Sequence, residues 1–294
     1  MKLAVSSYSF QQYIKAGKMT QLDAVRRAAE MGFSGIEFTD LKPVVDQVPT
    51  LQEQLAYAAE IRREAQACGI EIVGYMISAN LYGGSAEADE AEVARLKGQV
   101  DVAKALGASL MRHDVCRTER FGDRVVSFDR MLPTIAENVR QVATYAAEQG
   151  IRTCSENHGF IAQDSDRVER LYNMVAHENY GVLVDMGNFA CADEDSVRAV
   201  SRLAPYAIHA HAKDFMIKPY GTKLEDGLKS ITTRGCQVLI GCAVGDGDVP
   251  VEQCVAILKR AGYDGWITIE FEGNGDCIEE IAKGLARLKE YIQQ

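Results

Sequence analysis

The segment KRAGYDGWITIEF, residues 259–271, decides the fold, because a helical pattern ends at a glycine and runs directly into a short β-branched strand. The same order of helix, glycine and strand recurs in AEMGFSGIEF (29–38), AQACGIEIVGY (65–75) and AEQGIRTCSEN (147–157). The glycine fits the left-handed residue that commonly ends a helix. Recurrence of one such unit is typical of repeated βα units around a parallel sheet.

Eight β-branched runs alternate with longer amphipathic stretches along the 294 residues. The predicted strands are Leu3–Ser6, Gly35–Phe38, Ile70–Met76, Ser109–Arg112, Ile151–Ser155, Gly181–Val184, Tyr206–Ala210 and Trp266–Ile269. The predicted helices cover about residues 19–31, 49–67, 87–106, 128–149, 164–178, 193–203, 250–261 and 276–291. This alternation predicts one domain over residues 1–294, a single (β/α)₈ TIM barrel.

One connection, residues 213–248, is unusually long for a compact domain. It contains CQVLIG (236–241), which suits an extra short strand. It leads into GDGDVP (245–250), which suits a tight turn before a helix. We expect this extended loop to fold over the barrel mouth and to shape the substrate pocket.

Composition narrows the function classes. A formal charge of −10 opposes broad binding to nucleic acid, and no apolar run approaches the length that spans a bilayer. The eight cysteines form no CxxC pair, which favours reduced thiols. The N-terminal residues MKLAVSSYSF turn polar too soon for a signal peptide. We therefore expect a cytoplasmic protein with a small-molecule partner.

Four consecutive predicted strands end in residues that bind metals. These residues are Glu156 in IRTCSENHG, Asp185 in GVLVDMGN, His211 in AIHAHAKD and Glu270 in WITIEFEG. The C-terminal ends of the strands form the active site of such a barrel. A carboxylate directly after apolar residues is costly unless it is paired or binds a cation. The pattern predicts one divalent ion, with Mn²⁺ or Mg²⁺ favoured and Co²⁺, Fe²⁺ or Zn²⁺ also compatible.

Other polar residues near the same strand ends are candidates for contact with substrate. His158 shares strand parity with Glu156, and Arg112 ends the fourth strand. For both, a structural or solvated role is an equally good interpretation. One of Lys213 and Asp214 is expected to touch substrate, whereas His209 lies deeper and is favoured as a packed residue.

The sequence resembles the xylose isomerase-like TIM barrels, which include sugar phosphate isomerases and epimerases, ketose 3-epimerases, inosose-pathway enzymes and endonuclease IV. The likeness covers the whole chain. It is carried by SSYSF, GFSGIEF, ENHG, VDMGN, HAHAKDF and GDGDVPVEQCVAILKRAGYDGWITIEFEG, in that order. The resemblance implies a metal held by Glu156, Asp185, His211 and Glu270. It also implies that Glu156 and Glu270 lie on opposite sides of a carbohydrate substrate and transfer its protons.

Two positions depart from the epimerase pattern, since Asn188 stands where a histidine is common and Asp214 where a glutamate is common. Both are expected to bind substrate, and both leave the reaction open. The first hypothesis is an isomerase or epimerase that acts through a metal-stabilised enediolate of a small sugar, keto-sugar or inositol derivative. The alternative is a lyase or dehydratase that acts on a keto-sugar, an inosose or a 3-oxo-glycoside.

Two further interpretations are weaker. A nuclease like endonuclease IV would need an Asp-x-His pair that is missing and a positive surface for DNA. A sugar-binding protein without catalytic activity is the other. Dimers and tetramers are frequent in the resembling family, so a homo-oligomer is compatible with the sequence.

Overall fold

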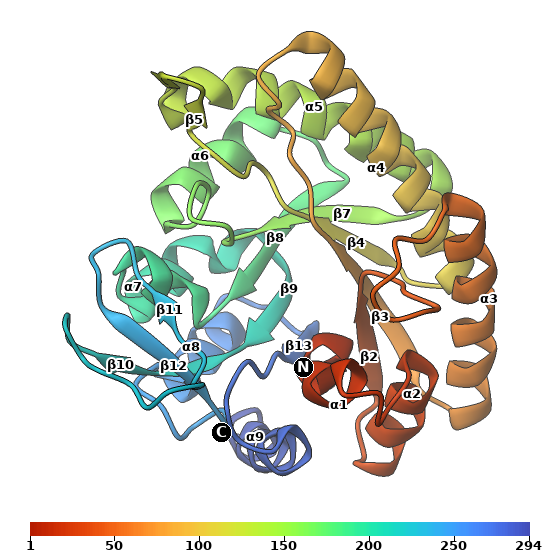
Figure 1. The fold of residues 1–294 in the computed structure, drawn as a ribbon, viewed down its shortest axis with the longest axis vertical. Helices are drawn as coiled ribbons and strands as arrows, with labels where there is room; N and C mark the ends of the chain where they lie inside the picture. The colour runs from red at the N-terminus through yellow and green to blue at the C-terminus, as the bar shows by residue number, and fades with distance from the viewer.

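Eight parallel strands close into a barrel in the computed structural model, which describes all of residues 1–294 (Figure 1). Around the barrel the order is β1-β13-β9-β8-β7-β4-β3-β2. The strands are β1 (Lys2–Ser6), β2 (Gly35–Thr39), β3 (Glu71–Ile77), β4 (Leu110–His113), β7 (Arg152–Glu156), β8 (Tyr180–Asp185), β9 (Ala207–Ala212) and β13 (Trp266–Ile269). The predicted (β/α)₈ TIM barrel is confirmed.

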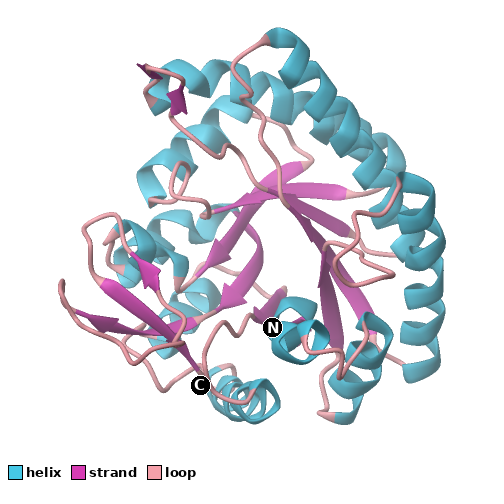
Figure 2. Cartoon of the chain, viewed as in Figure 1, coloured by secondary structure: helices cyan, strands magenta, loops and turns pink.

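Helices surround the barrel on the outside (Figure 2). They are α2 (Gln21–Glu30), α3 (Leu51–Cys68), α4 (Ala86–Leu106), α5 (Phe128–Gln149), α6 (Ser165–Val175), α7 (Ser196–Leu203), α8 (Val251–Arg260) and α9 (Cys277–Tyr291). A short helix, α1 (Gln11–Lys15), follows β1 after a 3₁₀ turn. Gly69, Gly107 and Gly150 end α3, α4 and α5 with φ of 66°, 84° and 74°, the left-handed conformation that the sequence predicts there.

Several element boundaries differ from the predicted ones. Helix α6 ends at Val175 because Ala176 adopts a left-handed φ of 44°. Helix α7 begins only at Ser196, since residues 188–192 form a 3₁₀ turn that Asp193 ends with a φ of 57°. Strand β9 continues to Ala212, two residues beyond the predicted end, so His211 lies within the strand.

Residues 214–242 include a separate antiparallel sheet, with the order β10-β12-β11 (Figure 1). Its strands are β10 (Asp214–Lys218), β11 (Ile231–Thr232) and β12 (Val238–Cys242), and β12 overlaps the extra strand predicted in CQVLIG. A parallel bridge joins Gly241 of β12 to Gly273, three residues after Glu270. A side chain at Gly241 would collide with the backbone of Glu272, so this close approach requires glycine. A small hairpin, β5 (Arg120–Phe121) with β6 (Arg124–Val125), was not predicted.

The inside of the barrel is layered. Met76, Leu110, Cys154 and Leu183 form a small apolar cluster that is separate from the main core between strands and helices. Side chains two residues apart on a strand point to the same side. The inward positions that follow this cluster toward the strand ends are therefore polar, with Glu156 after Cys154 on β7. The apolar layer forms a floor below a polar layer.

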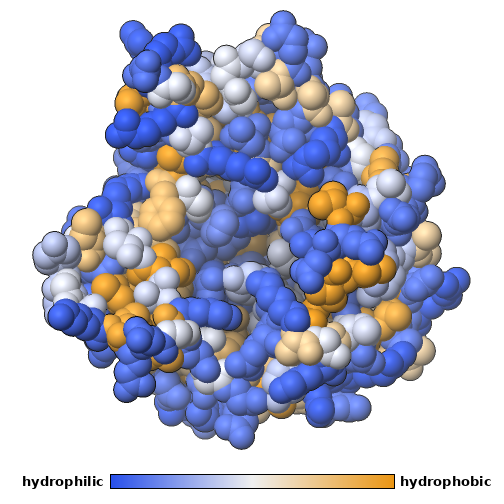
Figure 3. Space-filling view, viewed as in Figure 1, coloured by the Kyte–Doolittle hydropathy of each residue, from blue (hydrophilic) through white to orange (hydrophobic).

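The view of the molecule in Figure 3 has a recessed centre, and hydrophilic residues surround much of it. No helix combines the length and the apolar character that crossing a membrane would need.

Candidate metal centre and active site

The four predicted metal ligands converge at the C-terminal ends of their strands. Glu156 ends β7, Asp185 ends β8, His211 lies in β9, and Glu270 follows β13 directly. One ligand atom from each lies within 4.8 Å of the others. His211 Nδ1 lies 3.6 Å from Glu156 Oε1, 3.8 Å from Asp185 Oδ2 and 3.6 Å from Glu270 Oε2.

Two buried atoms that face each other in this cluster, Asp185 Oδ2 and His211 Nδ1, make no hydrogen bond within the protein. Both residues are almost completely buried, at 0% and 1% exposure. A polar atom that is buried without a partner is unfavourable, and a cation between these atoms would satisfy both. Three carboxylates and one imidazole are a donor set for a divalent ion. The residues present therefore fit a divalent metal.

Two basic side chains balance the acidic cluster. Lys213 Nζ lies 2.5 Å from Glu270 Oε2 and 3.3 Å from Asp185 Oδ2. Arg112 lies 2.5 Å from Glu156 Oε2. Burial alone would lower the pKa of Lys213, but the charges of Asp185 and Glu270 hold it well above its ordinary value. Each of the two glutamates is thus paired with a cation.

These pairings also set the charge states of the carboxyls. Burial would raise the pKa of Glu156, but Arg112 holds it well below its ordinary value. Burial acts on Glu270 in the same direction, while Lys213 and His211 lower its pKa to about 2. Burial dominates at Asp185 and raises its pKa to about 6. The three carboxyl groups of the cluster are therefore mostly ionised at neutral pH.

A second polar group borders the cluster on the side of β4. His158 Nδ1 lies 2.8 Å from Asp114 Oδ1, and Arg112 lies 2.9 Å from the same oxygen. The His158 side chain is 45% exposed, and its Nε2 makes no hydrogen bond within the protein. This Asp-His pair leaves one imidazole nitrogen free to exchange a proton with a bound molecule.

Asn188 lies inside the cluster, whereas Asp214 does not. The Asn188 amide donates to Glu156 Oε1 at 2.9 Å, and its oxygen accepts from Lys213 Nζ at 3.2 Å. The carboxylate of Asp214 points into the turn of residues 245–249 and accepts four backbone N–H groups, from Phe215, Gly245, Gly247 and Val249. All its strong acceptor directions are used within the protein, so the structure does not bring Asp214 to the cluster that the predicted ligands form.

Two contacts of the site are not evident from the sequence alone. Asp114, which holds His158, stands in the segment MRHDV beside Arg112, and nothing in that segment indicates a partner 44 residues away. Tyr8, in SSYSF, donates to Glu272 Oε1 at 2.6 Å, and Glu272 Oε2 lies 3.7 Å from Lys213 Nζ. The proximity of strand ends in a barrel was the available signal for both.

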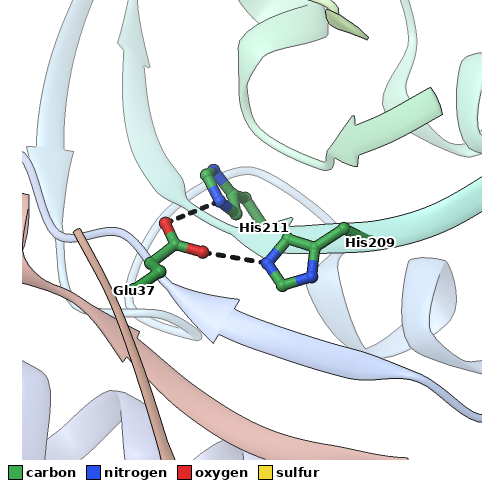
Figure 4. Close-up of side chains that lie close together, drawn as sticks. All are labelled: Glu37, His209 and His211. Carbon is green, nitrogen blue, oxygen red and sulfur yellow. Dashed lines mark hydrogen bonds and ion pairs between the residues drawn. The ribbon is translucent and has the colours of Figure 1, made fainter. Parts of the chain in front are cut away.

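Below the metal cluster, Glu37 of β2 lies between two histidines of β9 (Figure 4). Glu37 Oε1 is 2.9 Å from His211 Nε2, and Glu37 Oε2 is 2.9 Å from His209 Nε2. His209 is 1% exposed, as expected for a packed histidine. Glu37 is itself completely buried, so it lies below the metal cluster rather than in an open pocket.

A closed parallel barrel with a carboxylate and histidine cluster at its strand ends defines a TIM barrel with a candidate metal centre. The chain belongs to the xylose isomerase-like TIM barrel family, whose family model matches residues 25–291.

The chain is also similar to curated relatives and to solved structures. An inosose dehydratase of Clostridium perfringens is 23% identical over 174 residues, which span 58% of this chain and 58% of that relative. An inosose dehydratase of Geobacillus thermodenitrificans is 22% identical over 286 residues, 95% of this chain and 90% of the relative. The crystal structure of the IolI protein, described with a bound zinc atom, matches with a TM-score of 0.74 at 15% identity, over 100% of this chain and 98% of that one. At this identity the structural likeness concerns the fold.

Proposed function

We propose that the protein is a divalent-metal-dependent lyase that removes water from a small keto-sugar or keto-cyclitol. The reaction takes a proton from the carbon next to the carbonyl and expels the hydroxyl one carbon further on. The observation that carries this proposal is the Asp114–His158 pair beside a cluster whose two glutamates are already held by Arg112 and Lys213. The names of the two inosose dehydratase relatives point in the same direction.

Glu156, Asp185, His211 and Glu270 would hold the ion, with Mn²⁺ or Mg²⁺ favoured and Co²⁺, Fe²⁺ or Zn²⁺ compatible. When bound, the ion supplies Lewis-acid stabilisation of negative charge on the substrate oxygens. The ammonium group of Lys213, next to Glu270 and Asp185, adds a hydrogen-bond donor for the same developing charge.

His158 is the proton carrier of the proposed reaction. Its free Nε2 takes the proton from the carbon, and the electron pair of the C–H bond moves toward the carbonyl oxygen. When the carbonyl re-forms, the C–O bond of the hydroxyl breaks, and the imidazolium returns the proton to the leaving oxygen. The products are a conjugated enone and water. Asp114 fixes the ring orientation and stabilises the imidazolium through Nδ1.

Epimerisation, the first hypothesis from the sequence, needs a base on each face of one carbon. Both oxygens of Glu156 are engaged, Oε2 with Arg112 at 2.5 Å and Oε1 with Asn188 at 2.9 Å. Lys213 pairs with one oxygen of Glu270, Oε2, at 2.5 Å. Carboxylates that are held by cations are weak bases. These contacts favour elimination, which requires a single proton carrier.

The test is incubation of the Mn²⁺-loaded protein with an inosose, 3-dehydroshikimate and 3-oxo-glucose in deuterated water. We expect one of them to develop the ultraviolet absorbance of a conjugated enone, with NMR signals of the elimination product. His158→Asn should slow the rise in absorbance by about 10²–10⁴-fold while the protein still binds Mn²⁺. Inverted carbon centres without an enone would contradict elimination and support an epimerase. Unchanged substrates on this panel would contradict the proposed substrate class.

A further inference from the structure

Glu37 is a buried charge with an unusual set of partners. Its two carboxylate oxygens lie 2.9 Å from His211 Nε2 and 2.9 Å from His209 Nε2, and no lysine or arginine pairs with it. Thr268 Oγ1 of β13 lies 3.1 Å from the same His209 nitrogen. A carboxylate that is 0% exposed is strongly unfavourable unless hydrogen bonds stabilise it. His209 does so through a hydrogen bond, and His211 approaches the second oxygen through the close contact of its Nε2.

The hydrogen-bonded ladders of the barrel are irregular at both residues of this contact, Glu37 and His209. The β2–β3 ladder shifts register between Ile36 and Glu37, and the β8–β9 ladder shifts between Val182 and Leu183, whose partners are Ala207 and His209. These are the two register shifts among the barrel's ladders. Such irregularities redirect side chains and are frequent beside active sites. The backbone therefore adjusts where Glu37 and His209 point inward.

We infer that Glu37 is a positioning residue that presents His211 to the metal. Glu37 Oε1 lies 2.9 Å from His211 Nε2 and favours the tautomer with its proton on Nε2, which leaves Nδ1 as a lone-pair donor that faces Glu156, Asp185 and Glu270. Metal-binding histidines commonly donate their other ring N–H to a carboxylate, which fixes the tautomer and strengthens the ligand. His209 holds the second oxygen of Glu37 and keeps the carboxylate in place (Figure 4). The inference rests on the proposed metal centre and is independent of the reaction.

The test measures Mn²⁺ affinity without substrate. The full chain is stripped of metal and titrated with Mn²⁺, and free Mn²⁺ is followed by its EPR signal. We expect one ion per chain, and an affinity about 10–100-fold weaker in Glu37→Gln. Glu194→Gln is the matched control, because the Glu194 carboxylate accepts from Ser165 N at 2.7 Å and does not contact the cluster. Its Mn²⁺ affinity should equal that of the wild type.

A second measurement needs no variant. Long-range ¹H–¹⁵N NMR of the wild type loaded with diamagnetic Zn²⁺ should show His211 with its proton on Nε2. Folded Glu37→Gln protein with unchanged Mn²⁺ affinity, or a His211 proton on Nδ1 in the Zn²⁺-loaded wild type, would overturn the inference. So would two ions per chain, one of them lost in His209→Asn, because Glu37, His209 and His211 would then be ligands themselves. Absence of elimination activity would contradict the proposed function alone, since no substrate is used here.

Discussion

The ammonium group of Lys213 lies 2.5 Å from the Glu270 carboxylate, at the point where four strand ends bring three carboxylates and the His211 imidazole together. Lys213 is 5% and Glu270 13% exposed at the side chain, so this pair is shielded from water. Lys213 also balances the charge of Asp185, at 3.3 Å. A bound divalent ion would take over much of that role.

Lys213→Met should therefore destabilise the metal-free protein by about 3 kcal/mol, because it leaves buried carboxylates without a cation. Mn²⁺ should recover a large part of this loss. Urea unfolding in EDTA and in Mn²⁺ measures both values, with Lys213→Arg as the variant that keeps the charge. Equal losses with and without Mn²⁺ would contradict the shared charge balance of Lys213 and the metal.

His158→Asn and Asp114→Asn should each lower turnover by about 10²–10⁴-fold, because the proton carrier or its orienting group is lost. Stability should change little in His158→Asn, since the side chain is 45% exposed. His177→Asn is the matched control, because His177 bonds Thr144 on the exposed outside of the barrel. Turnover in His158→Asn that equals the wild-type value would rule out His158 as the proton carrier.

Asp214→Asn should lower the free energy of unfolding by about 3 kcal/mol, because an amide cannot accept all four backbone N–H groups that the carboxylate accepts. Gly247→Ala should destabilise the same turn, since its Cβ would collide with Asp214. Thermal unfolding measures both. If Asp214→Asn instead kept its melting temperature and raised KM, the residue would bind substrate, as the sequence first suggested.

The stability of the protein should depend on pH through His113. Burial lowers the pKa of His113 to about 4, from an ordinary value near 6.5. In the unfolded chain, His113 therefore binds a proton below about pH 6.5. In the folded protein, His113 binds this proton only below about pH 4. Stability from this residue is present at pH 7 and falls by about 2 kcal/mol at pH 5. Urea unfolding at the two pH values measures it, and His113→Phe should reduce the difference by that amount. An equal pH dependence in the variant would exclude His113 as its source.

The barrel and its metal cluster could be predicted from the sequence because both depend on repeated local patterns. Each βα unit is encoded within about one helix and one strand, and barrel closure brings all strand ends to the same mouth. Glu156, Asp185 and Glu270 could thus be predicted to meet without knowledge of any single contact. Strand parity likewise indicated that His158 faces the same way as Glu156.

Contacts between distant loops could not be predicted in this way. Asp214 follows the strand that bears His211, yet its carboxylate turns toward residues 245–249, which fold back from more than 30 residues away. The partner of His158 depends on the loop after β4, and the partner of His211 on a residue from β2. The hydrophobic periodicity of the sequence does not indicate such pairs, because they arise from tertiary packing.

The most direct test is anomalous X-ray diffraction from crystals of the protein soaked in Mn²⁺. We predict a single strong peak at roughly 2.0–2.3 Å from Nδ1 of His211 and from carboxylate oxygens of Glu156, Asp185 and Glu270. No peak among these four residues, or a peak between Glu37, His209 and His211 instead, would contradict the proposed metal centre.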